Sequence, residues 1–150
     1  MMPDRRSLLT ALALLPLWPQ AALARSPEIF APNGIALGGR DPVAYAQGRG
    51  PVAGAVSHAV MWRGAVWHFV STATMEAFEM DPVRYCPAFG GYCAWALAQG
   101  YLAPTVPEAF SLHEGRLFLN ASIQVRGLWR ADIDRMVALG DTHWPGVLDG

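Results

Sequence analysis

The sequence predicts an α+β fold, a small single domain in which antiparallel β-hairpins pack with three helices. Two stretches rich in apolar and aromatic residues, each interrupted by a residue pair ending in glycine, predict the hairpins. Short apolar segments that begin at a capping residue predict the helices. The order of elements is strand, strand, helix, helix, strand, strand, helix, which is typical of antiparallel sheets in an α+β protein.

Residues 1–24 have the pattern of a secretory signal peptide. Arg5 and Arg6 precede an apolar run from Leu8 to Trp18, and the small-x-small sequence ending at Ala24 is typical of a cleavage site. With these flanks the run is too short for a membrane span. The arginine pair indicates the twin-arginine route, which exports folded proteins. We therefore expect a periplasmic protein that is cut after Ala24.

Residues 25–150 then form the domain, and this length suffices for one hydrophobic core. The full chain has a formal net charge of −1, and its arginines are scattered along the sequence. This distribution gives no basic stripe for binding nucleic acid. No second apolar run reaches membrane length, so we expect no stable membrane span after cleavage.

The domain begins with a segment, residues 26–57, that is rich in Gly, Pro and Ala and predicts loops. Within it, Asp41 precedes Pro42, a pair that favours a turn. We expect the Asp41 carboxylate to accept a backbone N–H in that turn.

The first hairpin is predicted over residues 57–62 and 65–70, with Arg63-Gly64 as a two-residue turn. In this register His58 pairs with Phe69 and shares the aromatic face of the hairpin. His68 lies on the opposite face.

Two short helices are predicted next. Ser71 is placed to cap a helix over about residues 72–80, which Asp81-Pro82 ends. The second helix is opened by Gly90-Gly91 and closed by Gly100.

The remaining elements are a second hairpin and a last helix. The stretch AFSLHEGRLFLN predicts a hairpin that turns at Glu114-Gly115. Asn120 is then placed to cap a helix over about residues 121–139, which has an apolar stripe at helical spacing.

Five segments of the chain occur in the order found in a known family. They are GGRDPVAY, SHAVMWRGAVWHFVS, FEMDPVRY, AFGGYCAWALAQGY, and LFLN with a later Trp and Asp-Ile. Over about residues 35–146 this order resembles the exported branch of the YHS-domain proteins. The resemblance implies a YHS core similar to the treble clef and export by a twin-arginine signal. It also implies partners among metal transport or resistance proteins.

The metal site of the wider YHS group is not carried over to this chain. That group resembles DPVCG followed by YFCSEGC, and those cysteines carry the metal. Here Ala44, Val70 and Met75 stand at or near those positions. The match to the exported branch instead makes Cys93, in GGYCAWA, the first candidate site residue. Cys86 is less typical of the branch.

Cys93 has a physical reason to be reactive if its helix begins near Gly91. Unpaired N–H groups and the positive end of the helix dipole favour a thiolate in a first turn, and thiolates bind soft metals. The leading hypothesis is therefore a soft-metal protein that binds Cu(I) or Zn(II) with Cys93 as principal ligand, and with His58, Cys86 or a methionine completing the ligand shell. We expect an aromatic pocket around the thiol, with these walls: Tyr45, Tyr85, Tyr92 and Trp95.

The two cysteines leave other functions open. Their C-x6-C spacing differs from a zinc knuckle or a thioredoxin-type pair, and the intervening Pro87 and glycines permit a disulfide. One alternative is thiol redox chemistry at Cys93 with Cys86 as resolving partner. The other is a non-catalytic binding module with structural cysteines. No Ser-His-Asp order, phosphate loop or HExxH motif occurs, so enzyme activity has little direct support.

Overall fold

The computed structural model describes residues 16, 19 and 24–150 of the chain. The predicted export signal at Arg5 and Arg6 lies outside the described residues. Ala24 is exposed at the start of the continuous part. Within the part of the chain that the structure describes, no helix is long and apolar enough to cross a membrane.

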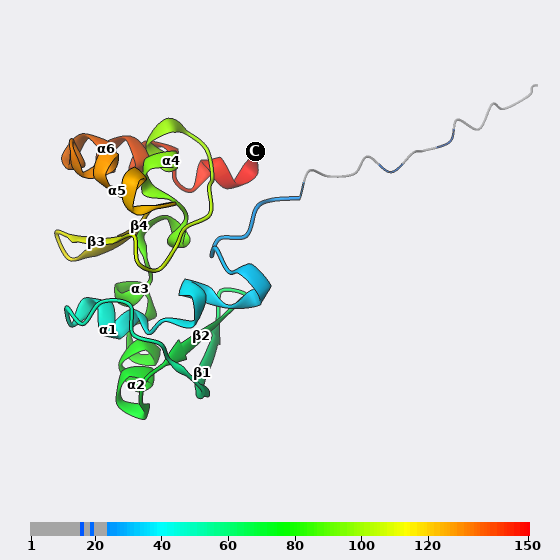
Figure 1. Cartoon of the computed structure of the whole chain (residues 1–150). Coiled ribbons are helices and arrows are strands. Elements are labelled where there is room, and N and C mark those ends of the chain that lie inside the picture. Colours follow the sequence, from blue (N-terminus) through cyan, green and yellow to red (C-terminus); the bar gives the residue numbers. More distant parts are fainter. Residues whose placement is uncertain (1–15, 17–18, 20–23) are drawn as a thin grey trace, which may run out of the picture.

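The domain has two groups of elements, one above the other in Figure 1. The lower group holds α1, α2, α3 and the β1–β2 hairpin, and the upper group holds α4, α5, α6 and the β3–β4 hairpin. The predicted α+β class is confirmed, although residues 24–150 form six α-helices where three were expected. The elements in chain order are η1 (Pro32–Gly34), η2 (Ala36–Gly39), α1 (Pro42–Ala46), β1 (Ala55–Trp62), β2 (Ala65–Phe69), α2 (Thr72–Met80), α3 (Pro82–Tyr85), η3 (Ala88–Gly91), α4 (Ala94–Gln99), β3 (Phe110–His113), β4 (Arg116–Leu119), α5 (Ile123–Arg130), α6 (Ile133–His143) and η4 (Gly146–Asp149), where η denotes a 3₁₀ turn.

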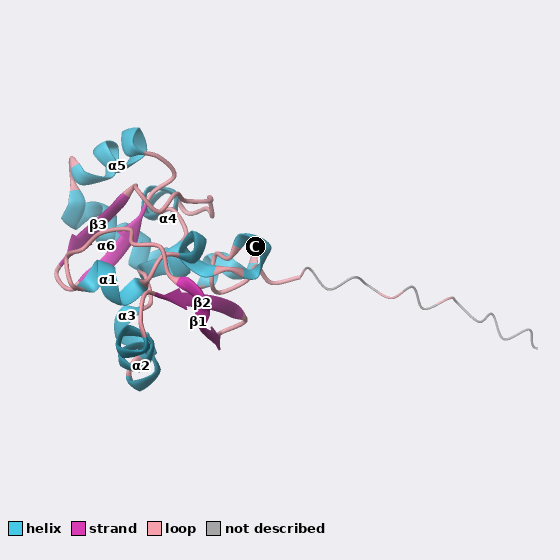
Figure 2. Ribbon diagram, turned by 60° about the horizontal axis from the view of Figure 1, so that its bottom comes forward, coloured by secondary structure: helices cyan, strands magenta, loops and turns pink. Residues whose placement is uncertain are grey.

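Both hairpins turn where the sequence predicts. They form separate two-stranded antiparallel sheets, which Figure 2 shows in magenta. Arg63 and Gly64 both have positive φ, at 48° and 76°, and so do Glu114 and Gly115, at 48° and 75°. Two consecutive residues of positive φ are the signature of the type I′ turn, whose twist matches that of the strands.

The predicted pairing of His58 with Phe69 is wrong. Trp62 pairs with Ala65 as expected, but Phe69 pairs with Ala55, because β1 contains an irregularity between Ala55 and Ala59. The extra residues of such a bulge lack a partner on the other strand and bend it. The bulge therefore takes His58 out of the regular ladder.

Asp41 joins the loop-rich segment to the first hairpin, and its predicted turn is confirmed. Its carboxylate is fully buried, and Oδ1 accepts the N–H of Val43 at 2.8 Å and that of Ala44 at 3.3 Å. Oδ2 accepts the N–H of Val70 at 2.9 Å. Asp41 thus caps α1 and ties it to the end of β2, which fixes the lower group of elements.

Strand β4 lies between two apolar cores, since successive side chains of a strand point to opposite faces. Leu117 and Leu119 pack into the lower core, and Phe118 packs into the upper core. The lower core is centred on aromatic residues of β2 and α2: Trp67, Phe69 and Phe78. The upper core is centred on Phe89, Phe118 and Trp129. The two halves of the domain are therefore held together across β4.

Helix α2 begins and ends as predicted, with Ser71 as its cap, but α4 begins later than expected. Gly90 and Gly91 have positive φ, at 61° and 89°, and belong to η3, so they do not open the helix. A Cβ at Gly90 would overlap the carbonyl oxygen of Glu28, whose segment crosses here. The glycine is thus needed for a close approach of two backbones.

The single last helix that the sequence predicts is two helices, α5 and α6. The break falls at Asp132, whose non-helical backbone (φ −148°, ψ 62°) ends the helical run and allows α6 to pack back against α4. Ser122 caps α5, and its Oγ accepts the N–H of Val125 at 3.1 Å. The predicted capping role of Asn120 at this helix is wrong, because its buried side chain instead accepts the backbone N–H of Trp95 in α4.

Candidate functional site

Cys93 is the residue that precedes α4, and it is almost fully buried, with 1% of its surface exposed. Its Sγ donates to Oδ1 of Asn120 at 3.5 Å, and the same oxygen accepts the N–H of Trp95 at 3.1 Å. Asn120 follows β4, so this contact ties the start of α4 to the end of that strand. The arrangement makes Cys93 part of a buried polar junction between two elements.

Cys86 follows α3 and is half-buried. Burial raises the pKa of its thiol from 9.0 to about 12, the Arg63 guanidinium lowers the pKa, and the Glu28 carboxylate raises it. The thiol donates to the carbonyl oxygen of Pro87 at 3.5 Å. At neutral pH the group is therefore a protonated thiol rather than a thiolate.

The three predicted metal ligands belong to different elements of the fold. Cys86 and Cys93 are both free thiols, with no disulfide between them. Among the described residues, Cys93, Cys86 and His58 are not gathered as a group of three potential metal ligands. His58 lies in the bulged strand β1, where its buried Nδ1 has no hydrogen-bond partner in the described part of the chain. The assignment of these three residues to one metal stays a prediction.

The four predicted pocket walls divide between the two cores. Tyr45 and Tyr85 pack with the lower core, and Tyr92 and Trp95 pack with the upper core. The buried hydroxyl of Tyr45 donates to the carbonyl oxygen of Pro107 at 2.8 Å. That of Tyr92 donates to the carbonyl oxygen of Pro27 at 2.8 Å. Burial raises the pKa of both tyrosines. These side chains join segments that are distant in sequence.

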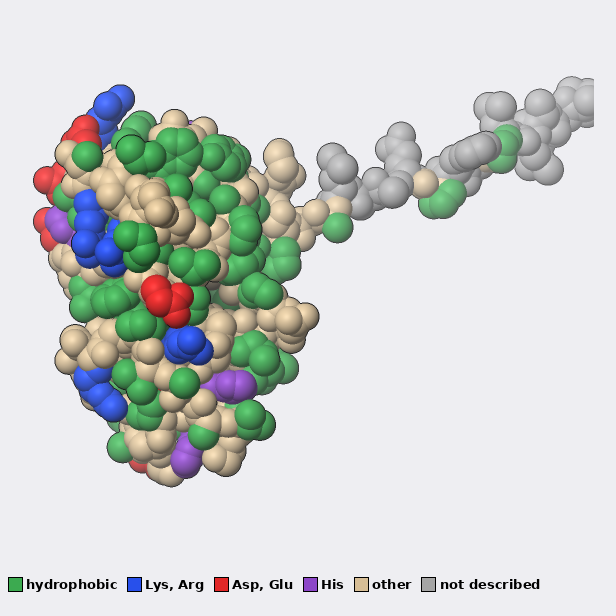
Figure 3. All heavy atoms as spheres, in the orientation of Figure 1, with side chains coloured by type: hydrophobic (Ala, Val, Ile, Leu, Met, Phe, Trp, Pro, Cys, Tyr) green, Lys and Arg blue, Asp and Glu red, His purple; other side chains and the backbone are tan. Residues whose placement is uncertain are grey.

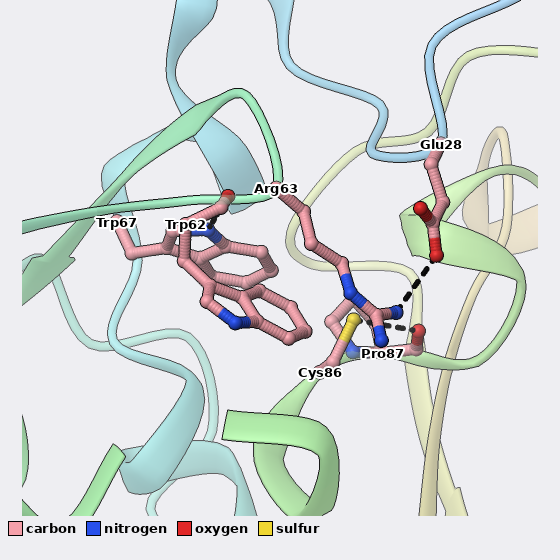
Figure 4. Close-up of polar contacts among 6 residues, drawn as sticks. All are labelled: Glu28, Trp62, Arg63, Trp67, Cys86 and Pro87. Atoms are coloured by element: carbon pink, nitrogen blue, oxygen red, sulfur yellow. Dashed lines mark hydrogen bonds and ion pairs between the residues drawn. The ribbon is translucent and has the colours of Figure 1, made fainter. Parts of the chain in front are cut away.

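The structure instead places Cys86 in the wall of a groove between the two halves of the domain. The groove has a volume of about 240 Å³. Figure 4 shows part of its lining, where the Arg63 side chain extends from the β1–β2 turn past the Cys86 sulfur toward Glu28. The lining residues come from the N-terminal segment, the two hairpin turns, α3, η3 and the C-terminal region: Glu28, Ile29, Arg63, Val83, Arg84, Cys86, Pro87, Ala88, Phe89, Gly90, Gly115, Arg116 and Trp144.

Three arginines and one glutamate make this lining cationic. Arg63 pairs with Glu28 at 2.7 Å and lies over the Trp62 ring, 4.4 Å from its centre. Arg116 forms two hydrogen bonds to Asp141, at 3.0 and 2.9 Å. Arg84 stacks on Tyr85, and within residues 24–150 no carboxylate pairs with it. Asp81 accepts only the Arg84 backbone N–H, at 3.3 Å, so the Arg84 guanidinium makes no ion pair in this part of the chain.

An apolar cavity of about 70 Å³ lies beside the groove. The two hollows share Ile29, Pro87 and Gly90 in their walls. The inner wall of the cavity includes Trp67 and Leu119, which belong to the lower core. The joint between the two halves thus offers a charged surface next to a small apolar one, a combination that is typical of ligand sites.

Comparison of the chain with family models, curated proteins and solved structures gives no match. The resemblance to the exported YHS-domain proteins, including its treble-clef-like core, accordingly stays a prediction.

Proposed function

We propose that this chain is a non-catalytic binding module that holds a small organic anion in the groove beside Cys86. The observation that carries the proposal is the Arg84 guanidinium, which lines the groove and has no carboxylate partner in the described part of the chain. Arginine is the side chain that best matches a carboxylate or phosphate, because its planar fork donates two parallel hydrogen bonds.

The charge of the groove supports an anion rather than a cation. Its lining carries three positive charges and one negative charge, while the whole chain has a formal net charge of −1. Since Glu28 pairs with Arg63 and Asp141 with Arg116, the excess positive charge at this concave place comes from Arg84. Such a cleft raises the local concentration of an oppositely charged ligand.

The protonated state of Cys86 fits the same ligand. A thiolate in the wall would repel an anion, whereas a thiol with a pKa of about 12 is uncharged at neutral pH. The Glu28 carboxylate already occupies Arg63, as a ligand carboxylate would. The contact between Glu28 and Arg63 is therefore an example, within the protein, of a carboxylate bound to an arginine of this groove.

Isothermal titration of the full chain with succinate and with inorganic phosphate tests the proposal, with neutral succinamide as the ligand control. We expect Arg84→Gln to weaken binding of the anions about tenfold or more, since hydrogen bonds to charged groups contribute about 1.5–3 kcal/mol. Arg49→Gln is the matched control, because Arg49 is an exposed arginine outside this groove lining. Equal affinities of the Arg84 and Arg49 variants, or equal binding of succinamide, would contradict the proposal.

Soft-metal handling by Cys93 and thiol redox chemistry stay predictions. A thiol that is 1% exposed and bonded to Asn120 gives neither of them added support. Periplasmic location also stays a prediction, because it depends on residues that the structure does not describe.

A further inference from the structure

The tip of the β3–β4 hairpin brings three metal-ligating side chains together with α6. His113 ends β3, Glu114 is the first residue of the turn, and Asp134 lies in the first turn of α6. One donor atom from each lies within 4.8 Å of the others, and His113 Nε2 is 3.1 Å from Asp134 Oδ1. In Figure 3, histidine and acidic side chains gather at the left edge of the molecule, where the β3–β4 hairpin ends.

The hairpin and the helix are held in place by a neighbouring contact. Arg116 lies opposite His113 in the register of the two strands. Its guanidinium forms two hydrogen bonds to Asp141 of α6. Asp134 and Asp141 are seven residues apart, which places them on the same face of the helix. The same face of α6 is therefore fixed against the hairpin next to the three ligands, and this reduces the conformational freedom lost on metal binding.

Among the described residues, no arginine offsets the two carboxylates of the cluster. Arg116 forms an ion pair with Asp141, and Nη1 of Arg135 lies 3.8 Å from Oδ2 of Asp132. In the described part of the chain, no arginine pairs with Glu114 or Asp134. The two carboxylates are left to be balanced by a divalent cation.

We propose that His113, Glu114 and Asp134 bind a divalent first-row metal ion such as Zn(II) or Cu(II), with water in the remaining positions. One imidazole nitrogen and two carboxylate oxygens form a donor set that suits these ions and is distinct from soft thiolate ligation. The ion replaces the hydrogen bond between His113 and Asp134. None of the three ligands lines the groove, and the site uses neither cysteine.

The test is a Zn(II) titration of the full chain in competition with a chromophoric chelator. We expect His113→Gln and Asp134→Asn each to weaken binding at least about tenfold, the lower end of what loss of even an outer-shell partner costs. Asp132→Asn is the matched control, a neighbouring carboxylate outside the cluster, and it should bind as the wild type does. Equal affinity of the His113→Gln variant and the wild type, or no binding by the wild type, would overturn the proposal.

Co(II) spectra of the same proteins identify the ligand atoms. Ligation by nitrogen and oxygen gives only weak visible bands, and these should disappear in His113→Gln. An intense sulfur charge-transfer band that persists in His113→Gln would instead assign the ion to Cys86 or Cys93 and contradict the proposal. Thermal unfolding of each variant without metal serves as the check that the fold is intact.

Discussion

Cys86 should react with iodoacetamide about thirtyfold to a thousandfold more slowly in the folded protein than in the unfolded chain, because the scarcer thiolate of a thiol with a raised pKa is also the stronger nucleophile. The reacting species is the thiolate, and burial in the groove wall raises the pKa of this thiol from 9.0 to about 12. At pH 8 this difference lowers the thiolate fraction about a thousandfold. Alkylation is followed by peptide mass spectrometry, which separates Cys86 from the buried Cys93, with a sample in denaturant as the reference.

The Glu28→Gln variant tests whether the groove charges control this thiol. Glu28 raises the Cys86 pKa and also engages Arg63, whose charge lowers it. Removing the carboxylate charge should therefore lower the pKa and speed alkylation of Cys86. Glu108→Gln is the matched control, since Glu108 is an exposed carboxylate that pairs with Arg40 instead.

Two results would refute this reasoning. The first is a folded-state alkylation rate close to that of the denatured sample. The second is an alkylation rate in Glu28→Gln that equals the rate in Glu108→Gln. Either result would mean that burial in the groove wall and the charge of Glu28 do not set the pKa of Cys86.

Two further predictions concern stability. Between pH 9 and 12 the unfolded chain loses the Cys86 proton while the folded protein keeps it, so stability should fall as pH rises, by at most about 1.4 kcal/mol per pH unit from this group. Cys86→Ala should make this alkaline slope in urea denaturation shallower without abolishing it, because burial also raises the pKa of Tyr45; an unchanged slope would contradict the prediction. Asp41→Ala should lower the free energy of unfolding by about 3–5 kcal/mol, because it leaves three backbone N–H groups without their acceptor. Asp81→Ala, which removes an exposed helix cap, should cost about 1 kcal/mol, and equal losses in the two variants would count against the role of Asp41.

The local elements could be predicted because their signals are local. The turn at Arg63-Gly64, the cap at Ser71 and the close of α4 at Gly100 each depend on residues within a few positions of one another. Residue preferences at turns and helix ends act over that range. Asp41 was predictable as a turn residue for the same reason, but its bond to the end of β2 was not.

The errors arose where a distant segment decides the local conformation. Gly90 resembles a helix start in sequence, but its positive φ serves the approach of the Glu28 segment. Asn120 has the composition of a cap for the helix that follows it, but its oxygen accepts the N–H of Trp95, 25 residues earlier. No local pattern contains either contact.

The groove was missed for a related reason. Glu28 and Arg63 are 35 residues apart, and Arg84 and Arg116 come from two further elements. Scattered arginines indicate no site in a sequence, and only the fold places them around one concave surface. The sequence did single out Cys86 as a candidate, although its predicted role as a metal ligand stays untested.

The most direct measurement of the central claim is an NMR titration of the full chain with succinate, with amide signals followed residue by residue. Binding in the groove predicts the largest shifts at the amides of Arg84, Gly90 and Gly115, which belong to three different segments of its lining. It also predicts that these shifts vanish in Arg84→Gln and are absent with succinamide. Shifts that are spread over other surfaces, or that persist in Arg84→Gln, would contradict the claim that this groove is the anion site.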